Sequence, residues 1–342
     1  MKEVTPISNR KTEHLRINLE ENVQSGLTSG LECYHFVHHA LPEINLTDVD
    51  VSVKCFSKRL EAPILISSMT GGTSESADLN RILAIAAQEA HIAMGVGSQR
   101  IVLEQPELAN TFDVRDHAPD ILLFANLGAI QLNYGYGIEA CQRSVEMIHA
   151  DALVLHFNAL QEAIQREGDT HFAGIINKVE AICKELPVPV IAKEVGWGFS
   201  RHDITLLANA GVAAIDVAGA GGTSWSQVEM HRAENEEQRK LAAAFDDWGI
   251  PTVEVIENIL QVAPGLTIIA SGGLRNGIDI AKCIALGASL GGMASPFLKA
   301  AAQSVEETLK LINLLKQEIR VCMFVTGSKT LEELRDGKLR KQ

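Results

Sequence analysis

The chain has few aromatic residues, and its cysteines follow no recognised motif. Each of these observations limits the class of protein to which the chain can belong. Only 5% of its 342 residues are aromatic whereas 46% are hydrophobic. This balance is typical of an α/β enzyme packed with Ala, Ile, Leu and Val, and it excludes a disordered or fibrous chain. The six cysteines are widely scattered, without a C-x-x-C pair or the spacing of a zinc site. We therefore expect reduced thiols in a cytoplasmic protein.

The sequence also lacks long hydrophobic runs and an excess of positive charge. Its least charged stretch, residues 283–298, is interrupted by three glycines and a proline and is too short to span a bilayer comfortably. Residues 1–21 are rich in charge and have no apolar core, unlike a signal peptide. The formal net charge of −13 would repel nucleic acid and anionic membranes. We therefore expect neither as a partner, and an anionic ligand would require a local concentration of cations.

What the sequence does contain is a regular alternation of short apolar runs and amphipathic segments. Several runs are apolar at nearly every position, as strands covered on both faces are. The segments between them, such as residues 78–90 and 175–185, are typical of helices. Eight strand–helix units in sequence predict an α/β fold, a (β/α)8 TIM barrel; a doubly wound open sheet gives no natural account of eight units. The expected strands are 63–67, 92–96, 121–125, 152–155, 188–192, 213–217, 266–270 and 289–293.

Two connections between the expected strands are unusually long, residues 157–172 and residues 218–239. In a barrel both lie at the C-terminal mouth, where active-site loops belong. The second connection ends in a densely charged run, 229–240, which we expect to be solvated surface or a mobile lid. The expected division of the chain is an N-terminal arm, one barrel domain and a C-terminal helical tail, over residues 1–61, 62–303 and 304–342.

One polar cluster stands directly after the fourth expected strand, the heptad His156-Phe-Asn-Ala-Leu-Gln-Glu162. His156 and Asn158 alternate with Phe157, so they share one face if the strand continues. Gln161 and Glu162 follow where the strand ends. Such a cluster can hydrogen-bond a bound molecule and hold a hard cation through Glu162. From these seven residues alone, a polar strand end that caps a loop is an equal alternative.

Glycine clusters fall at the ends of five expected strands. Glycine permits left-handed turns and the close approach of a backbone to a ligand. The last two clusters follow strands seven and eight, where barrels commonly bind a phosphate with backbone N–H groups. We therefore expect a phosphate site there. The clusters are residues 69–72, 95–100, 219–223, 271–275 and 291–295.

Side chains at other strand ends would suit a flavin attached to that phosphate. Lys193 closes the fifth expected strand and would point a cation into the mouth. A cation beside a ring that becomes negative on reduction is a recurring way to tune a flavin; pairing with the carboxylate of Glu194 is the alternative for this lysine. Met69 and Thr70 offer an apolar surface and a hydroxyl for a planar ring, and Asn126 adds an amide.

The chain carries eight motifs in order: Arg10-Lys-Thr-Glu-His14, Phe36-Val-His-His-Ala-Leu-Pro42, Met69-Thr-Gly-Gly72, Gly97-Ser-Gln-Arg100, the heptad from His156, Lys193-Glu-Val-Gly196, Gly221-Gly-Thr223 and Ser271-Gly-Gly-Leu-Arg275. Together they resemble the type 2 isopentenyl-diphosphate isomerases. The resemblance runs from residue 10 to about residue 300, without a departure at the motif positions. Beyond about residue 308 the chain matches only in being helical.

The resemblance implies an FMN-dependent (β/α)8 barrel that interconverts isopentenyl and dimethylallyl diphosphate, with Mg²⁺ and reduced FMN. The reaction adds a proton to one carbon and removes another from the far side, through a state like a tertiary carbocation. Because the net reaction is redox-neutral, NADPH would serve only to reduce the flavin. An N-terminal arm over the barrel mouth further suggests a homo-oligomer, a tetramer or an octamer.

The resemblance also implies roles for individual residues. Gln161 and His156 would be catalytic, and Glu162 would bind Mg²⁺. Trp197 or Trp225 would shield the prenyl carbons; packing in the core or in a loop is the alternative for each tryptophan. The substrate would be bound by Arg10, Lys11, Ser98, Gln99, Arg100, His156, Asn158 and Gln161. FMN would be bound by Ser68, Met69, Thr70, Ser98, Asn126, Lys193, Thr223, Gly272, Gly273, Arg275, Ala294 and Ser295.

Two other functions stay open at this point. The first is another FMN barrel enzyme, such as a 2-hydroxy-acid oxidase or dehydrogenase, which shares the barrel and the phosphate glycines but needs a His base beside an Arg that clamps a carboxylate. The second is a non-catalytic flavin-binding protein, against which the ionisable and amide groups of the heptad argue. A hydride-transfer assay on hydroxy acids tests the first, and a yellow colour that dithionite bleaches would establish a bound flavin.

Overall fold

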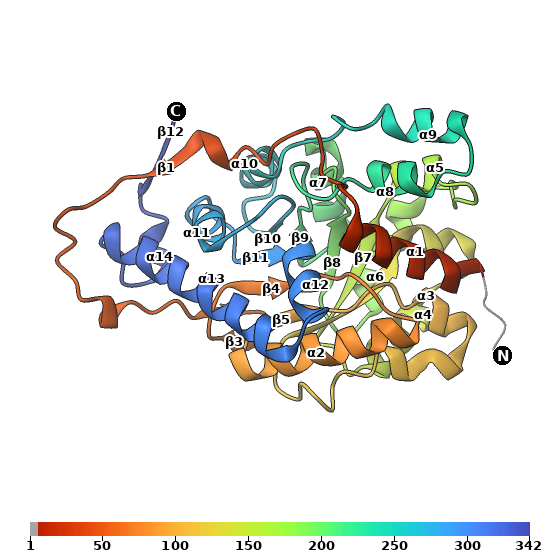
Figure 1. Cartoon of the computed structure of the whole chain (residues 1–342), viewed down its shortest axis with the longest axis horizontal. Helices are drawn as coiled ribbons and strands as arrows, with labels where there is room; N and C mark the ends of the chain where they lie inside the picture. The colour runs from red at the N-terminus through yellow and green to blue at the C-terminus, as the bar shows by residue number, and fades with distance from the viewer. Residues whose placement is uncertain (1–5) are drawn as a thin grey trace.

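Eight parallel strands close into a barrel in the computed structural model, which describes residues 6–342 (Figure 1). The order around the barrel is β10-β11-β4-β5-β6-β7-β8-β9, so strands that follow one another in sequence are neighbours in space. The predicted TIM barrel is confirmed, and each expected strand overlaps an observed one. The strands are β4 Ile64–Ile66, β5 Ala93–Gly95, β6 Leu123–Gly128, β7 Ala152–Phe157, β8 Val190–Glu194, β9 Ala214–Asp216, β10 Thr267–Ser271 and β11 Leu290–Met293.

The barrel interior changes from apolar to polar along the strands. Alternate side chains of a strand point to the same face, and one inward layer is an apolar cluster made of Leu65, Ala93, Phe124, Val154, Ile191, Ala214, Ile269 and Leu290. Two positions further along, all eight strand ends carry a polar residue or glycine: Ser67, Gly95, Asn126, His156, Lys193, Asp216, Ser271 and Gly292. This second set, the polar layer, lies at the C-terminal mouth of the barrel.

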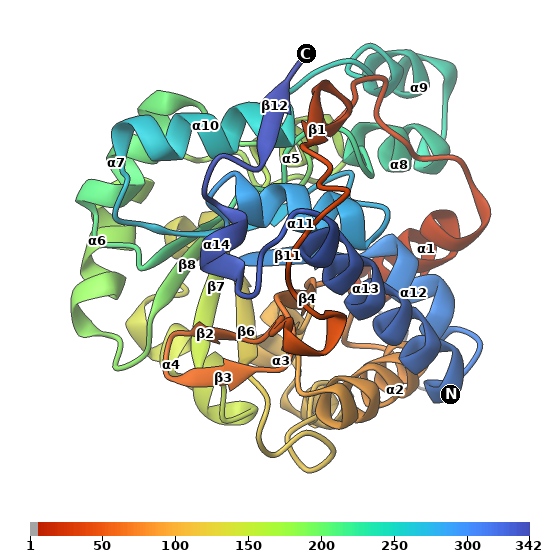
Figure 2. The same cartoon turned by 90° about the vertical axis from the view of Figure 1, so that its left-hand side faces the viewer.

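A short hairpin closes the N-terminal end of the barrel, opposite the mouth (Figure 2). Its strands, β2 (Val53–Cys55) and β3 (Lys58–Leu60), pair antiparallel, and Leu60 is buried in the same cluster as the inward apolar layer. The ring of Phe56 meets that of Phe124 edge to face, with centroids 6.2 Å apart. Apolar side chains thus fill this end, which leaves the C-terminal mouth as the face open to a ligand.

Helices surround the barrel and cover its outer face (Figures 1 and 2). Outward strand residues such as Ile66, Leu155 and Ile215 share one large core with the helices. The surrounding helices are α2 Ser74–Ala90, α4 Ile138–Met147, α6 Ile175–Glu185, α7 Arg201–Asn209, α10 Thr252–Val262, α11 Gly277–Ala285 and α13 Val305–Val325. Shorter helices stand in connections: α3 Arg100–Glu104, α5 Ala159–Ile164, α8 Trp225–Arg232, α9 Glu236–Ala243, α12 Ser295–Ala301 and the 3₁₀ helices η1 Leu31–Cys33, η2 Leu46–Asp48, η3 Pro106–Thr111 and η4 Ala129–Tyr134.

The C-terminal segment closes the ring of helices and then meets the arm. α13, which follows the eighth strand, packs against α2 and α11, the helices of the first and the seventh units of the barrel. After α14 (Leu331–Leu334), β12 (Leu339–Lys341) pairs antiparallel with β1 (Tyr34–Phe36). The segment predicted as a helical tail therefore also ends in a strand.

The N-terminal arm folds over the mouth of its own barrel. Its helix α1 (Pro6–Glu20) packs against α8 and α12 (Figure 1). The chain then runs beside the glycine loop after β9, where the backbone N–H of Ser25 donates to the carbonyl of Gly222 at 2.8 Å. A single chain thus brings its arm to the predicted site. Within residues 6–342, no helix has the length and apolarity needed to cross a membrane.

Candidate active site

A cavity of about 670 Å³ opens at the mouth of the barrel, beneath α1. Its size is typical of a ligand or cofactor site. Its walls come from the polar layer, the glycine clusters, α1, α5, α8 and α12. All but one of the predicted site residues line it: Arg10, Lys11, Ser68, Met69, Thr70, Ser98, Arg100, Asn126, His156, Asn158, Gln161, Glu162, Lys193, Thr223, Gly272, Gly273, Arg275, Ala294 and Ser295.

Gln99 is the predicted residue that lies outside the cavity lining. Its side chain is fully buried, and both ends of its amide bind the backbone. Nε2 donates to the Ser144 carbonyl at 2.8 Å, and Oε1 accepts the N–H of Asn126 at 2.9 Å. Gln99 therefore supports the strand end that carries Asn126, and the structure does not place it where a substrate could reach it.

The heptad forms the end of β7 and the start of α5. Asn158 and Glu162 are four residues apart and lie on one face of this turn, so Asn158 Nδ2 donates to Glu162 Oε1 at 2.8 Å. Nδ2 also contacts Gln161 Oε1 at 3.2 Å. The other amide atom, Asn158 Oδ1, is buried without a partner. A carboxylate beside an unpartnered amide oxygen is a donor set that suits a hard cation.

The Glu162 carboxylate is only 7% exposed and is also held from the loop behind it. Its Oε2 accepts the backbone N–H of Asp169 at 2.7 Å and the side-chain amide of Gln165. Among the described residues no cluster of three or more His, Cys, Asp or Glu side chains could hold a metal. A cation at Glu162 would therefore need amide, water or phosphate oxygens as further ligands.

His156 is half-buried in the polar layer, with its Nδ1 2.8 Å from Asn126 Oδ1. Burial, followed by the charges of Lys193, Lys11 and Arg10, lowers the pKa of His156 to about 3. The imidazole is therefore neutral at physiological pH. Because an amide oxygen faces Nδ1, the proton is assigned to Nδ1, which leaves Nε2 able to take up a proton when an anion binds beside it.

Lys11 brings a cation from α1 into the mouth. Its Nζ donates to the carbonyls of Gly71 at 2.7 Å and Ser98 at 2.9 Å, and lies 5.2 Å from the centroid of the Phe112 ring. Burial and the neighbouring charge of Arg10 lower the pKa of Lys11 to about 7. The arm therefore supplies two adjacent cations to the cavity, as the negative net charge of the chain led us to expect.

Arg100 adds a third cation at the start of α3. Its Nε donates to Glu104 Oε1 at 2.9 Å and its Nη1 to Asp169 Oδ2 at 2.5 Å. Tyr136 donates its hydroxyl to Glu104 at 2.7 Å. Although burial opposes it, hydrogen bonds from Tyr136 and Arg100 hold the pKa of Glu104 below its usual value. The guanidinium is thus fixed between two carboxylates while it faces the cavity.

Glu229 corrects the prediction for the charged run that begins with it. This residue is 5% exposed and not solvated. Its Oε1 accepts from His14 Nε2 at 2.9 Å and from Gln161 Nε2 at 3.4 Å, and its Oε2 accepts from Arg232 at 2.6 Å. From Glu234 onward most of the run is exposed, as predicted. Glu229 is a residue that sequence reasoning missed, and its contact orients the predicted catalytic amide of Gln161.

A second wall of the cavity, at the glycine clusters, is built mainly from backbone. Gly273 has a φ of +79°, and a Cβ there would lie 2.6 Å from the Gly221 carbonyl oxygen, so the loops after β9 and β10 meet at a distance that requires glycine. Thr252 Oγ1 donates to the Gly272 carbonyl at 2.6 Å and holds this loop from behind. The predicted phosphate site is therefore rigid.

Two features of this wall fit a flavin nucleotide. Ser67 Oγ is buried without a partner in the polar layer, and a Cβ at Gly292 would lie 2.6 Å from it. Lys193 enters the same layer and donates to the Glu194 carbonyl at 2.7 Å, whereas the Glu194 carboxylate accepts the backbone N–H groups of residues 195–198. Lys193 thus forms no ion pair with the Glu194 carboxylate. The polar layer therefore contains the unpartnered hydroxyl of Ser67, the glycine beside it and the cation of Lys193.

Asp216 belongs to the polar layer and was also missed. It accepts from Ser271 Oγ at 2.5 Å, and burial raises its pKa although the Lys193 charge opposes the rise.

Of the two tryptophans considered, Trp225 lines the cavity, and the centroid of its ring lies 5.0 Å from that of His14. Trp197 is buried and lies outside the cavity lining.

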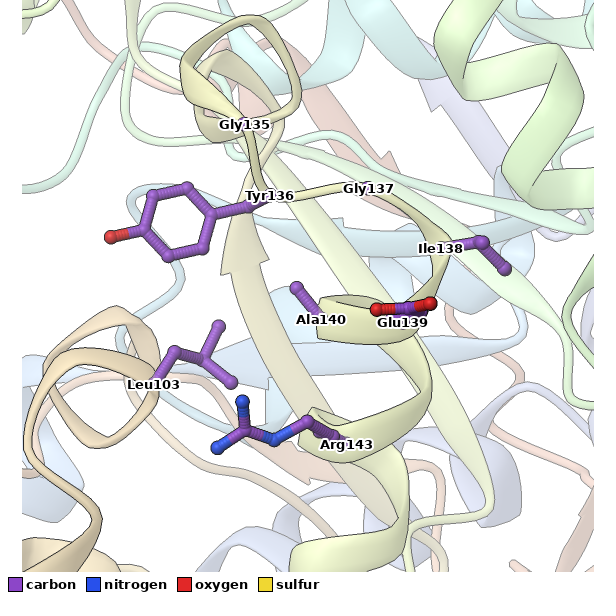
Figure 3. Close-up of a pocket in the computed structure, with 8 residues that line it drawn as sticks. All are labelled: Leu103, Gly135, Tyr136, Gly137, Ile138, Glu139, Ala140 and Arg143. Atoms are coloured by element: carbon purple, nitrogen blue, oxygen red, sulfur yellow. The ribbon is translucent and has the colours of Figure 1, made fainter.

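A second, smaller hollow of about 400 Å³ lies at the start of α4 (Figure 3). The figure shows the ring of Tyr136 and the side chain of Leu103 near the exposed Arg143. No predicted site residue and no unpartnered buried polar atom lies in its lining. The cavity at the barrel mouth is therefore the candidate active site.

Comparison with known proteins places this chain among flavin enzymes. The family model described as FMN-dependent dehydrogenase matches residues 139–341. An isopentenyl-diphosphate delta-isomerase of Nostoc sp. is 53% identical, covering 95% of this chain and 93% of its own length. Another, from Rickettsia bellii, is 49% identical and covers 97% of both chains.

Solved structures share the fold. A flavocytochrome b2 variant with pyruvate bound has a TM-score of 0.69, with 17% identity over 96% of this chain and 82% of that chain. A mandelate oxidase variant with (S)-mandelic acid has a TM-score of 0.64, with 18% identity over 98% of this chain and 97% of that chain. At such identities the likeness shows the barrel fold alone.

Proposed function

The chain belongs to the isopentenyl-diphosphate delta-isomerases, and from this premise we propose that the cavity at its barrel mouth interconverts isopentenyl and dimethylallyl diphosphate. The family and the FMN-dependent fold make the protein a flavoenzyme of the isomerase class. The observation that carries the proposal is the division of one cavity into a wall of cations and a wall of glycine backbone. The two walls suit a diphosphate and a flavin nucleotide respectively.

We place the substrate diphosphate against Arg10, Lys11 and Arg100. These cations lie in one wall, and charge-assisted hydrogen bonds from them would anchor the anion. His156 and Asn158 face the same space from the end of β7, and Ser98 lines it next to the contact with Lys11. Binding an anion beside His156 would raise its low pKa, so that Nε2 becomes a donor. The diphosphate would thus complete hydrogen bonding that the polypeptide leaves open.

We place Mg²⁺ at Glu162. The supporting observation is the unpartnered Oδ1 of Asn158 beside the Glu162 carboxylate. Mg²⁺ prefers oxygen ligands and commonly binds one or two carboxylates together with water and substrate phosphates. The absence of a larger acidic cluster among the described residues agrees with a cation that is bound jointly with the diphosphate.

FMN would lie against the other wall, held by Ser68, Met69, Thr70, Ser98, Asn126, Lys193 and Thr223, with its phosphate at Gly272, Gly273, Arg275, Ala294 and Ser295. When bound and reduced by NADPH, FMN supplies acid–base chemistry and an electron-rich face beside the alkene. Gln161, oriented by Glu229, would hydrogen-bond near the reacting carbons. Trp225 would exclude water from them and face a developing positive charge with its ring.

The test is anaerobic conversion of isopentenyl diphosphate with FMN, Mg²⁺ and NADPH, omitting one component at a time. One stoichiometric reduction of the flavin should support many turnovers, because the net reaction consumes no electrons. 2-Hydroxy acids should not reduce the flavin. Product that tracks NADPH oxidation one for one, or flavin reduction by a hydroxy acid, would favour a dehydrogenase instead.

We also propose that the protein is a cytoplasmic homo-oligomer, a tetramer or an octamer. Its six cysteines form no disulfide, which is usual in a reducing compartment. Large apolar side chains remain exposed on the single chain, including Leu41 at 80% and Trp248 at 59%, and a contact between subunits would cover such side chains. Light scattering coupled to size exclusion measures the subunit number directly, and a monomer would contradict the proposal.

A further inference from the structure

The turn that follows α5 touches both the carboxylate assigned to Mg²⁺ and an arginine assigned to the diphosphate. Asp169 makes both contacts. Its backbone N–H donates to Glu162 Oε2 at 2.7 Å, and its own Oδ2 accepts from Arg100 Nη1 at 2.5 Å. One residue therefore meets the proposed metal site with its main chain and the proposed diphosphate site with its side chain.

Gly168 shows that this turn approaches Glu162 unusually closely. A Cβ at this position would lie 1.7 Å from the Glu162 carbonyl oxygen and 2.6 Å from its carbonyl carbon. A larger residue would force the turn, and Asp169 with it, away from Glu162. The Asp169 carboxylate is held from a second side, because Gln131 Nε2 donates to Oδ2 at 3.1 Å.

The ion pair between Asp169 and Arg100 is partly shielded from solvent. The exposed fractions of the two side chains are 19% and 24%, so salt and water screen the pair less than they screen a surface pair. Glu104 accepts a hydrogen bond from the same guanidinium at 2.9 Å, but it accepts its other hydrogen bond from Tyr136. Among the described contacts, Asp169 is thus the carboxylate that connects Arg100 to Glu162.

From these contacts we propose that Asp169 is a positioning residue that couples Mg²⁺ binding at Glu162 to diphosphate binding at Arg100. A cation that fixes the Glu162 carboxylate also fixes the N–H of Asp169, and the Asp169 side chain then holds the guanidinium toward the cavity. Because coupling between two ligands is reciprocal, a bound diphosphate strengthens Mg²⁺ binding by the same factor. The inference rests on the proposed roles of Glu162 and Arg100.

The coupling can be measured without turnover, by calorimetric titration of inorganic pyrophosphate into the oxidised, FMN-loaded enzyme. The coupling factor is the ratio of the pyrophosphate dissociation constants without and with Mg²⁺. Mg²⁺ and pyrophosphate also associate in solution, but this contribution is the same for every variant and cancels between them. The matched variants are Asp169→Asn and Glu104→Gln, each of which removes one carboxylate charge from Arg100. FMN absorbance and thermal unfolding show that each variant is folded.

We expect Asp169→Asn to lower the coupling factor about tenfold, the size of one charge-assisted hydrogen bond, while Glu104→Gln weakens pyrophosphate binding and leaves the factor unchanged. Gly168→Ala, which displaces the turn and keeps every polar side chain, should also lower the factor. An unchanged factor in Asp169→Asn, or equal changes in the two carboxylate variants, overturns the inference. A wild-type enzyme without any Mg²⁺ effect on pyrophosphate instead contradicts the metal role proposed for Glu162, so the two failures differ.

Discussion

The two walls of the cavity are built by different means. The cationic wall, from α1, α3 and α5, consists of long side chains that hold one another, such as Arg100 between Glu104 and Asp169. The glycine wall, at the ends of β8, β9, β10 and β11, consists mostly of main chain, with Lys193 as its cation at the end of β8, and a single Cβ at Gly273 would lie 2.6 Å from a carbonyl oxygen. Side chains can change rotamer, whereas the glycine loops cannot move without displacing their strands.

This difference agrees with the ligand that we propose for each wall. A substrate enters and leaves in every turnover, so contacts made by side chains under a helix such as α1 suit it. A cofactor stays bound, and fixed backbone donors hold it without reorganising. If each wall binds its ligand independently of the other, a substitution in one wall should leave the ligand of the other wall bound. The following predictions test that independence, from the largest expected effect to the smallest.

The largest effect is expected from Gly273→Ala in the glycine wall. Its left-handed φ of +79° and the nearby Gly221 carbonyl both oppose a side chain. We expect the dissociation constant of FMN to rise by at least about tenfold, which corresponds to roughly 1.4 kcal/mol of binding free energy, and the FMN content of the purified protein to fall. The ratio of flavin to protein absorbance measures it. Pyrophosphate should still bind with Mg²⁺ present; a parallel loss of pyrophosphate binding would show that the walls are not independent.

The second effect concerns Glu162→Gln in the cationic wall. This change keeps the shape of the side chain and removes its charge, so turnover should fall by about a hundredfold, the upper range for one charge-assisted contact. Mg²⁺ should no longer stimulate pyrophosphate binding, while FMN content stays at the wild-type value. Release of flavin with an intact Mg²⁺ response would mean that the metal site lies elsewhere.

Arg10→Ala and Lys193→Ala compare one cation from each wall. Removing a charge-assisted contact with a diphosphate costs about 1.5–3 kcal/mol, or roughly ten- to a hundredfold. Arg10→Ala should therefore raise KM by about that factor with FMN content unchanged. Lys193→Ala should loosen FMN or shift its reduction potential before it alters KM. A substrate titration and the flavin absorbance measure both, and equal flavin loss in the two variants would refute the division.

The smallest effect is the pH dependence of kcat/KM that we expect from the titration of Lys11. Its pKa, lowered by burial and Arg10 to about 7, means that the ammonium loses its proton as the pH rises through 7. The diphosphate needs the charged form, so kcat/KM should be highest below pH 7 and fall above it. The bound diphosphate raises the pKa, so kcat should fall only at higher pH. Lys11→Arg should remove the fall in kcat/KM; an identical profile in that variant would assign the fall to another group.

Local pattern was sufficient to predict the barrel and the polar and glycine-rich strand ends that line the cavity, whereas the roles of Arg10, Lys11 and Arg100 followed only from the family resemblance. Side chains alternate along a strand, so the position two residues after each inward apolar residue of β6, β7 and β8 had to carry Asn126, His156 and Lys193 into the mouth. The same alternation marks Asp216, two positions after the inward Ala214, and this signal was available in the sequence. The sequence also carries a signal for Glu229, because this residue stands at helical spacing from Trp225.

The remaining site residues depend on contacts between distant segments. Gln99 stands in a motif at a strand end, but whether its amide meets a ligand or a neighbouring backbone depends on Ser144, which lies 45 residues away in the chain. The chain length between Gln161 and Glu229 is 68 residues, and between Arg100 and Asp169 it is 69 residues. Periodicity relates residues within one element and carries no information across such separations.

The sequence by itself therefore determined the eight strands, the glycine loops and the cluster of polar residues at the mouth, because each follows from the geometry of a short segment. The folded chain decided which side chains hold these groups in place: Glu229 on Gln161, Asp169 between Arg100 and Glu162, and α1 over the cavity that it completes. These contacts exist only once closure of the barrel has brought the ends of all its strands to one face.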